Sequence, residues 1–173
     1  MMHKGMLRQF GDLVRSAYVL AGRIPDSLIA AIGRFAIAAV FWKSGQTKVE
    51  GFAIDLVDRV FQLGVPQLSS SAVDLFRDEY KLPLLDPHTA AVMAASAEHL
   101  FSFLILLGLA TRPAAAGLLG MTLVIQLFVY PGAYPTHGVW ITVLLFLIAR
   151  GAGVLSLDHL IARRYQARAL QAN

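Results

Sequence analysis

Cysteine is absent from the 173-residue chain, and charged residues are scarce. Without a thiol the chain can form no disulfide, hold no metal through thiolates and carry no covalently attached c-type haem. Any redox chemistry must therefore pass through a bound molecule or a partner protein. Asp, Glu, Lys and Arg make up only 15% of the residues, whereas 57% are hydrophobic. A soluble domain of this size has too little interior to hide so much apolar surface, so the composition indicates a membrane protein.

The sequence also lacks a phosphate-binding glycine loop, a dinucleotide fingerprint and a nucleophile elbow, which excludes a nucleotide cofactor held by these motifs. The net charge of +4 would suit a nucleic-acid partner. The basic residues, however, lie in short runs beside apolar segments, as is typical of membrane flanks, and we expect no nucleic-acid partner. The first 26 residues contain no compact apolar stretch ending in a small-residue cleavage site, so we expect no cleaved signal peptide.

Four apolar segments predict helices that cross a bilayer, although the first is shorter than the usual length of about 20 residues. They run over residues 27–42, 88–109, 114–130 and 139–155. Lys and Arg gather before the first segment, in the turn between the second and third, and after the fourth. The positive-inside rule then places both termini in the cytoplasm of a bacterium and residues 43–87 in the periplasm. We therefore predict one domain over residues 1–173, an all-α four-helix bundle in the bacterial inner membrane.

The stretch 43–87 is too long for a plain connector. Apolar residues recur with a helical period between Ile54 and Phe61 and again between Val73 and Tyr80. This predicts short amphipathic helices that lie on the membrane surface or cover the bundle. Such a segment can be a passive cover, or it can dock a protein partner or enclose a ligand. The candidate docking residues are Lys48, Phe76, Glu79 and Tyr80.

A charged residue lies in the middle of the first membrane segment, at Arg34. An isolated charge there costs about 2.5–3.5 kcal/mol on insertion scales, so it is expected to face the bundle and pair. Glu98, in the second segment, is its predicted partner, because the two lie about 12 and 18 Å from the cytoplasmic helix ends at 1.5 Å per residue. Gln126 of the third segment falls near the depth of Glu98, and His99 points about 100° away from it.

We therefore expect an intramembrane polar cluster of Arg34, Glu98, His99 and Gln126. The cluster can be a clamp that fixes helix register, or a site that handles a substrate, a quinone or a proton. His99 alone is more typical of a packing histidine than of a ligand.

The five histidines are scattered, with no pair at the i, i+4 spacing of a helical metal site. The one weak metal candidate is His88 with His137, both expected near the outer membrane edge. Asp86 and Glu79 would lie beside them in such a periplasmic site.

Several segments together resemble the DoxX-like family of small four-helix membrane proteins. They are Gly33-Arg34-Phe35, the run from Phe41 to Lys48, Glu98, the run from Leu107 to Arg112, and the ending Gly151-Ala152-Gly153-Val154-Leu155-Ser156-Leu157-Asp158. The resemblance covers nearly all of residues 27–164. Residues 76–85 and 126–131 are also similar to a branch found beside machinery that makes copper-binding modified peptides.

The resemblance implies an association with membrane redox systems, since the family's name derives from a terminal-oxidase and thiosulfate:quinone oxidoreductase setting. We accordingly expect an accessory or anchor subunit of a redox-associated or peptide-maturation system, not catalytic alone, with a protein partner in a membrane complex. One alternative is a quinone-reactive subunit with its site near Arg34, Glu98 and His99. Another is a transporter of a small molecule or metal, for which four helices would need to oligomerise to form a pore.

Overall fold

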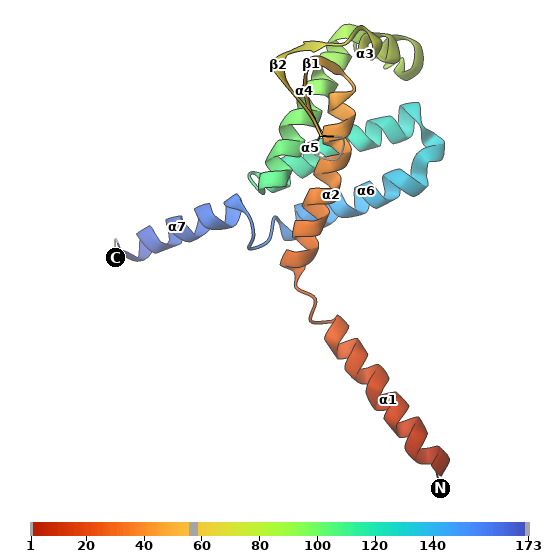
Figure 1. The fold of residues 1–173 in the computed structure, drawn as a ribbon, viewed down its shortest axis with the longest axis vertical. Helices are drawn as coiled ribbons and strands as arrows, with labels where there is room; N and C mark the ends of the chain where they lie inside the picture. The colour runs from red at the N-terminus through yellow and green to blue at the C-terminus, as the bar shows by residue number, and fades with distance from the viewer. Residues whose placement is uncertain (1, 56–58, 172–173) are drawn as a thin grey trace.

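A computed structural model describes the backbone of residues 2–55 and 59–171 and the side chains of residues 10–55 and 59–168. Within this part of the chain, four helical segments are long and apolar enough to cross a membrane (Figure 1). They are α2 (Asp26–Gln46), α4 (Pro87–Leu107), α5 (Thr111–Val124) with its π-helical extension η2 (Ile125–Val129), and α6 (Tyr134–Arg150) after the short 3-10 turn η3 (Pro131–Ala133). The prediction of a four-helix membrane bundle is confirmed.

The fourth helix is displaced from its predicted position. Residues 139–155 were expected, but α6 begins and ends five residues earlier, at Tyr134 and Arg150. Pro135 suits the first turn of a helix, where its missing N–H is not needed. Gly151 ends the helix because it takes a φ of 80°, which a side chain would strain.

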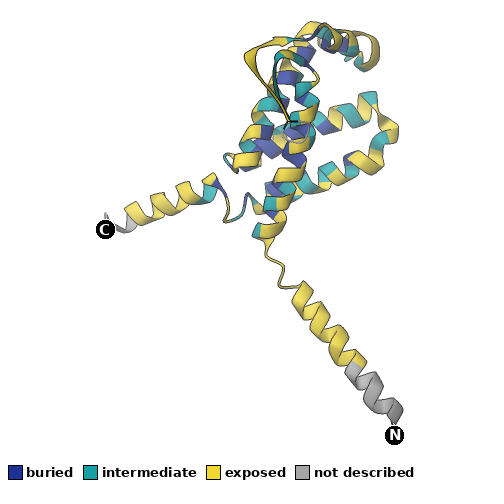
Figure 2. Ribbon diagram, in the orientation of Figure 1, coloured by how far each residue is buried: buried dark blue, intermediate teal, exposed yellow. Residues whose placement is uncertain are grey.

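The bundle core forms where the four membrane helices meet, and Figure 2 shows the buried residues concentrated there. α2 packs against α4 and α6, and α5 packs against α6 and α4. Alanines let the helix backbones approach closely, and larger apolar side chains fill the remaining space. The buried residues of this core are Ala30, Ile37, Ala38, Phe41, Ile105, Ala114, Ala115, Leu118, Leu144 and Leu147.

Residues 47–86, which we call the cap, join α2 to α4. Their first half is an antiparallel hairpin of β1 (Val49–Asp55) and β2 (Val60–Leu68), in which Ile54 pairs with Phe61. The amphipathic helix predicted between Ile54 and Phe61 is therefore wrong, apart from residues 56–58, which lie outside the described residues. Short-range periodicity could not reveal that this backbone bonds to a partner strand and to α2. Gly51 takes a φ of 81°, and its carbonyl oxygen would lie 2.4 Å from a Cβ at Gly64, so the two strands approach too closely for side chains.

The second half of the cap is helical, as α3 (Ser70–Asp74) and the π-helical η1 (Leu75–Tyr80). Ala72 and Phe76 are buried against Ala90 and Ala91 of α4 and form a small separate core. Asp86 caps α4, since its carboxylate accepts a hydrogen bond of 3.0 Å from the N–H of Thr89.

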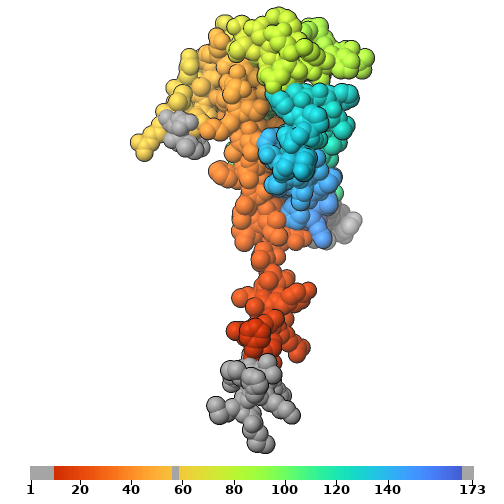
Figure 3. Space-filling model, turned by 90° about the vertical axis from the view of Figure 1, so that its right-hand side faces the viewer, coloured from red at the N-terminus to blue at the C-terminus, as the bar shows by residue number. Residues whose placement is uncertain are grey.

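Two helices extend from the other end of the bundle, α1 (Met2–Ala21) and α7 (Leu157–Gln171). Figures 1 and 3 show α1 standing clear of the body, and Figure 1 shows α7 leaving the same end in another direction. Asp26 and Arg150 pair at this end, with 3.5 Å between carboxylate and guanidinium. We call it the basic end and the opposite one the cap end. The membrane side that each end faces stays a prediction.

Candidate functional site

A buried ion pair joins the beginning of the cap, just after α2, to α4. The Lys48 Nζ lies 2.9 Å from Oε2 and 3.1 Å from Oε1 of Glu98. The two side chains are 5% and 2% exposed, so neither charge is solvated by water. Ser44 completes the group: its hydroxyl donates to Glu98 Oε1 at 3.0 Å, and its hydroxyl and carbonyl oxygens accept from Lys48 at 3.0 and 3.1 Å. An ammonium has three hydrogens, and these oxygens supply a partner for each.

Close approach of the two helices sets this geometry. Gly45 lies against α4, where a Cβ would be 2.9 Å from the His99 ring and 3.2 Å from the Glu98 Cβ. Without a side chain at Gly45, α2 and α4 come near enough for Ser44 and Lys48 to reach Glu98. The site therefore depends on one small residue at the helix crossing.

Arg34 does not pair with Glu98, and the predicted contact is wrong. Its guanidinium instead donates to the carbonyl oxygen of Leu155 and, at 3.4 Å, to that of Leu106, at the basic end. Helix register explains the difference. The prediction measured depth from the helix ends as if they were level, but Gly45 is the residue level with Glu98. The eleven positions from Arg34 to Gly45 correspond to about 16 Å along α2.

His99 belongs to a second network beside the ion pair. Its Nδ1 lies 2.7 Å from the carbonyl oxygen of Ala95, and its Nε2 lies 2.7 Å from Nε2 of Gln46. An amide nitrogen only donates, so Nε2 of His99 accepts from Gln46 and Nδ1 donates to the Ala95 carbonyl oxygen. Gln46 Oε1 accepts from the Ile54 N–H at 2.7 Å, and Trp42 donates to the Ile54 carbonyl oxygen at 2.9 Å. The network thus links α4, α2 and the hairpin.

An apolar groove of about 770 Å³ opens between the hairpin and α4. His99 lies in its wall, and its ring meets those of Trp42 and Phe52 edge-on at centroid distances of 5.1 and 6.2 Å. Val92, Leu100 and Phe103 of α4 line the groove further. Its few polar groups include Ser96 and Gln67. A groove of this size and lining suits an apolar or aromatic group better than a charged one.

A family model described as DoxX matches residues 29–131, which are 103 of the 173 residues. The chain belongs to the DoxX family. No match was found among curated proteins or among solved structures. The family matched is the one expected from the sequence, and membership supports a multi-pass membrane protein of the DoxX type.

Residues 151–158, whose sequence suggested the DoxX family, hold the ends of several helices together at the basic end, and we call this segment the clasp. Asp158 accepts hydrogen bonds from the backbone N–H groups of Ala110 and Thr111, at 2.8 and 3.0 Å, and so caps the start of α5. The Asp158 N–H donates to the carbonyl oxygen of Gly108 at 2.8 Å. Ser156 donates to Gly153 O at 2.6 Å and holds the turn that precedes α7. These residues therefore join helix ends, and Arg34 supports the same clasp from α2.

The other residues predicted for the polar cluster of this DoxX protein lie apart from Glu98. Gln126 of η2 donates through Nε2 to the Pro131 carbonyl oxygen, and its Oε1 accepts from Nδ1 of His137, each contact being 2.7 Å. His137 is buried, whereas His88 is exposed. No group of three or more His, Asp or Glu side chains is placed to hold a metal ion among the described residues. The expected cluster of four is thus divided among three places.

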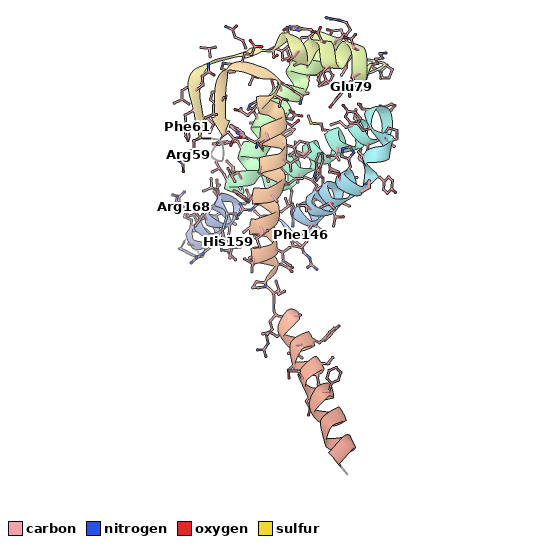
Figure 4. The ribbon with its side chains drawn as sticks, turned by 45° about the vertical axis from the view of Figure 1, so that its right-hand side comes forward. Arg59, Phe61, Glu79, Phe146, His159 and Arg168 are labelled. Carbon is pink, nitrogen blue, oxygen red and sulfur yellow. The ribbon has the colours of Figure 1, made fainter. Side chains whose placement is uncertain are left out.

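The predicted docking residues of the cap differ in exposure. Lys48 and Phe76 are buried, so they form no outer surface. Glu79 is exposed and accepts a hydrogen bond from Tyr130; Figure 4 labels it where η1 overhangs the turn before α6. That bond, with partial burial, raises the pKa of Tyr130 to about 12. Burial, with the neighbouring Tyr130 and acidic groups, raises the pKa of Tyr80 to about 12.

The sequence interpretation missed Ser44 and Gln46 as members of the site. Both lie in the polar run from Lys43 to Lys48 that ends an otherwise apolar helix. Because lipid disfavours polar residues unless they are paired, so many of them at the end of a membrane segment could have indicated that Ser44 and Gln46 belong to a paired site.

Proposed function

We propose that this DoxX-family protein is a non-catalytic accessory subunit that anchors or assists a redox-associated or peptide-maturation system in the bacterial inner membrane. The observation that carries this proposal is that Glu98, Lys48 and His99 all have partners within the protein. Each ammonium hydrogen of Lys48 has a protein acceptor, and both ring nitrogens of His99 have a protein partner. Groups so occupied hold helices together and offer no ready proton donor or acceptor to a substrate.

An accessory subunit needs a surface for its partner, and strand β2 is the best candidate. Leu63 and Val65 are each 79% exposed, and Phe61 of the same strand is 64% exposed. The outer edge of a strand such as β2 also presents backbone hydrogen-bonding groups to which another strand can add. Apolar side chains beside such an edge favour addition of a strand or an apolar segment from another protein. This places the proposed docking surface on β2 instead of on Phe76 and Lys48.

The test is affinity capture of the full-length protein from native membranes after chemical cross-linking. We expect capture of a subunit of an oxidoreductase or of a peptide-modifying enzyme. The double variant Leu63→Thr and Val65→Thr keeps strand propensity but removes the apolar surface, and it should lose that protein. Leu84→Thr is the matched control, because Leu84 is 93% exposed in the cap but lies outside β2. Equal capture by the wild type and the double variant would contradict the docking surface, and capture of no such subunit would contradict the function.

The groove beside His99 favours a second candidate, a site for a quinone. A quinone needs an apolar slot and a few hydrogen-bonding groups, and Nε2 of His99, once Gln46 releases the ring, can accept a hydrogen bond from a hydroxyl of the reduced quinone. Leu100→Trp should fill the groove and lower the quinone content of the purified protein in nanodiscs. Quinone no more abundant than in protein-free nanodiscs would refute this candidate.

A further inference from the structure

The first helix of the chain carries one apolar face that nothing in the structure covers. In its described part, apolar side chains recur at the i, i+3, i+4 spacing of a single helix face. They are Phe10, Leu13, Val14, Ala17 and Leu20. Phe10, Leu13 and Leu20 are each 65–67% exposed. Asp12 and Arg15 fall on the opposite face together with one apolar residue, Val19, so α1 is amphipathic.

The bundle does not provide a cover for this face. Figures 1 and 3 show α1 extending away from the basic end, and Figure 2 colours the described residues of α1 as exposed throughout. The last residue of α1 is nevertheless close to a membrane segment, because residues 22–25 alone separate α1 from α2. A membrane surface is therefore within reach of α1 in every copy of the protein.

The linker allows α1 to change direction relative to α2. The last backbone hydrogen bond on the α1 side joins the Ile24 N–H to the Ala21 carbonyl oxygen, and the first on the α2 side is accepted by Pro25. Proline has no N–H and disfavours helix in the residue before it, so the helical bonding is interrupted between Ile24 and Asp26. Rotation about the backbone bonds of this linker can therefore lay α1 on the membrane surface without disturbing the bundle.

The charge of residues 1–25 indicates which type of membrane surface α1 would bind. Residues 1–25 contain four basic residues, Lys4, Arg8, Arg15 and Arg23, against one acidic residue, Asp12. Arg112, Arg150, Arg163, Arg164 and Arg168 lie at the same end of the bundle or in α7. A basic polar face opposite an apolar face is the pattern of helices that lie in the interface of an anionic membrane.

We propose that α1 is a membrane-surface helix that binds anionic lipid. Its apolar face enters the boundary between headgroups and acyl chains at the basic end, and its basic residues contact anionic headgroups. The segment is too charged to cross the bilayer, and it lies outside the four spans of the described chain. Bound in this way, α1 makes the attachment of the basic end sensitive to the charge of its leaflet, a property separate from the proposed accessory role.

The test uses the full-length protein in nanodiscs with one copy per disc. Because the chain has no cysteine, single cysteines introduced by Leu13→Cys, Ala17→Cys, Asp12→Cys and Val19→Cys each carry one nitroxide label. In discs that mix phosphatidylcholine with phosphatidylglycerol, labels at Leu13 and Ala17 should be accessible to oxygen and shielded from a water-soluble nickel chelate. Labels at Asp12 and Val19 should behave in the opposite way.

A charge variant tests the electrostatic part. Arg15→Gln with Arg23→Gln should lower the ratio of bound to free α1 about 25-fold, or about fivefold per charge, which corresponds to about 1 kcal/mol for each basic residue. Arg163→Gln with Arg164→Gln removes as much charge from α7 and should leave the α1 labels unchanged.

Three outcomes would overturn the proposal. Equal exposure of the two faces to the nickel chelate in anionic discs would show that α1 does not lie in the interface. The same burial in discs of phosphatidylcholine alone would remove the requirement for anionic lipid. Burial that occurs only in discs with two copies would assign the apolar face to a second copy of the chain.

Discussion

Removing either partner of the Lys48–Glu98 ion pair is predicted to destabilise the bundle strongly. The expected loss for Lys48→Met is about 3–5 kcal/mol of unfolding free energy, because it leaves a carboxylate 2% exposed without its cation. Glu98→Gln should fall at the lower end of this range, since Lys48 keeps both oxygens of Ser44. The double variant should be less destabilised than the sum of the two.

The magnitude follows from the distances. Two unit charges about 3 Å apart attract by about 5.5 kcal/mol at an effective dielectric constant of about 20. Removing both charges from water costs several kcal/mol per ion, so the intact pair contributes little net stability. A single substitution loses the attraction but keeps the desolvation of the remaining charge. We therefore expect a coupling free energy between Lys48 and Glu98 of about 2 kcal/mol or more.

The assay is reversible unfolding by dodecyl sulfate in mixed micelles, followed by the fluorescence of Trp42, which lies beside the site. A second cycle with Arg34→Met and Glu98→Gln provides the control. Its coupling should stay below about 0.5 kcal/mol, because the two side chains are in separate networks. Strong coupling of Glu98 to Arg34 and weak coupling to Lys48 would refute the helix register described above.

Three further outcomes are expected. Gly108→Ala should cost about 2–4 kcal/mol, because the residue has a φ of 67° and its Cβ would lie 2.1 Å from a guanidinium nitrogen; Gly120→Ala, with open space around it, is the control in the same unfolding assay. Asp158→Ala should cost about 1–3 kcal/mol by leaving two N–H groups at the start of α5 without acceptors, and faster amide exchange there would confirm the cause. Tyr130, whose pKa is raised to about 12 by Glu79, should contribute stability that is complete below its unfolded pKa of about 10 and lost as pH rises through about 12. In a tyrosinate absorbance titration Glu79→Gln should lower the midpoint of Tyr130, and an unchanged midpoint would rule out this contact.

Part of the site could be recognised before the structure was known. The sequence singled out Arg34 and Glu98 as charges that need partners, since an unpaired charge is costly in lipid, and both side chains are buried and paired within the protein. The choice between Arg34 and Lys48 as the partner of Glu98 could not be made from helix depth. It depends on how far α2 slides along α4, and that shift follows from Gly45 at the crossing and from the segment 151–156 folded beneath α4.

The hairpin is a second feature that could not be predicted from the sequence alone. The apolar pattern from Ile54 to Phe61 fits a helix, yet the backbone of Ile54 is bonded by Gln46 and Trp42 of α2. Hydrogen bonds from side chains elsewhere in the chain outweigh a helical periodicity that extends over only eight residues. Residues 70–80, in contrast, are helical where their own periodicity indicates a helix.

By itself, the sequence determined that the chain is a four-helix membrane protein of the DoxX family, because hydrophobicity and segment length are properties of each segment alone. Only the tertiary structure decided that Lys48 neutralises Glu98, that Arg34 and Asp158 close the basic end, and that a hairpin covers the groove beside His99. These contacts join residues distant in the chain, and the approach of one helix to another determines them.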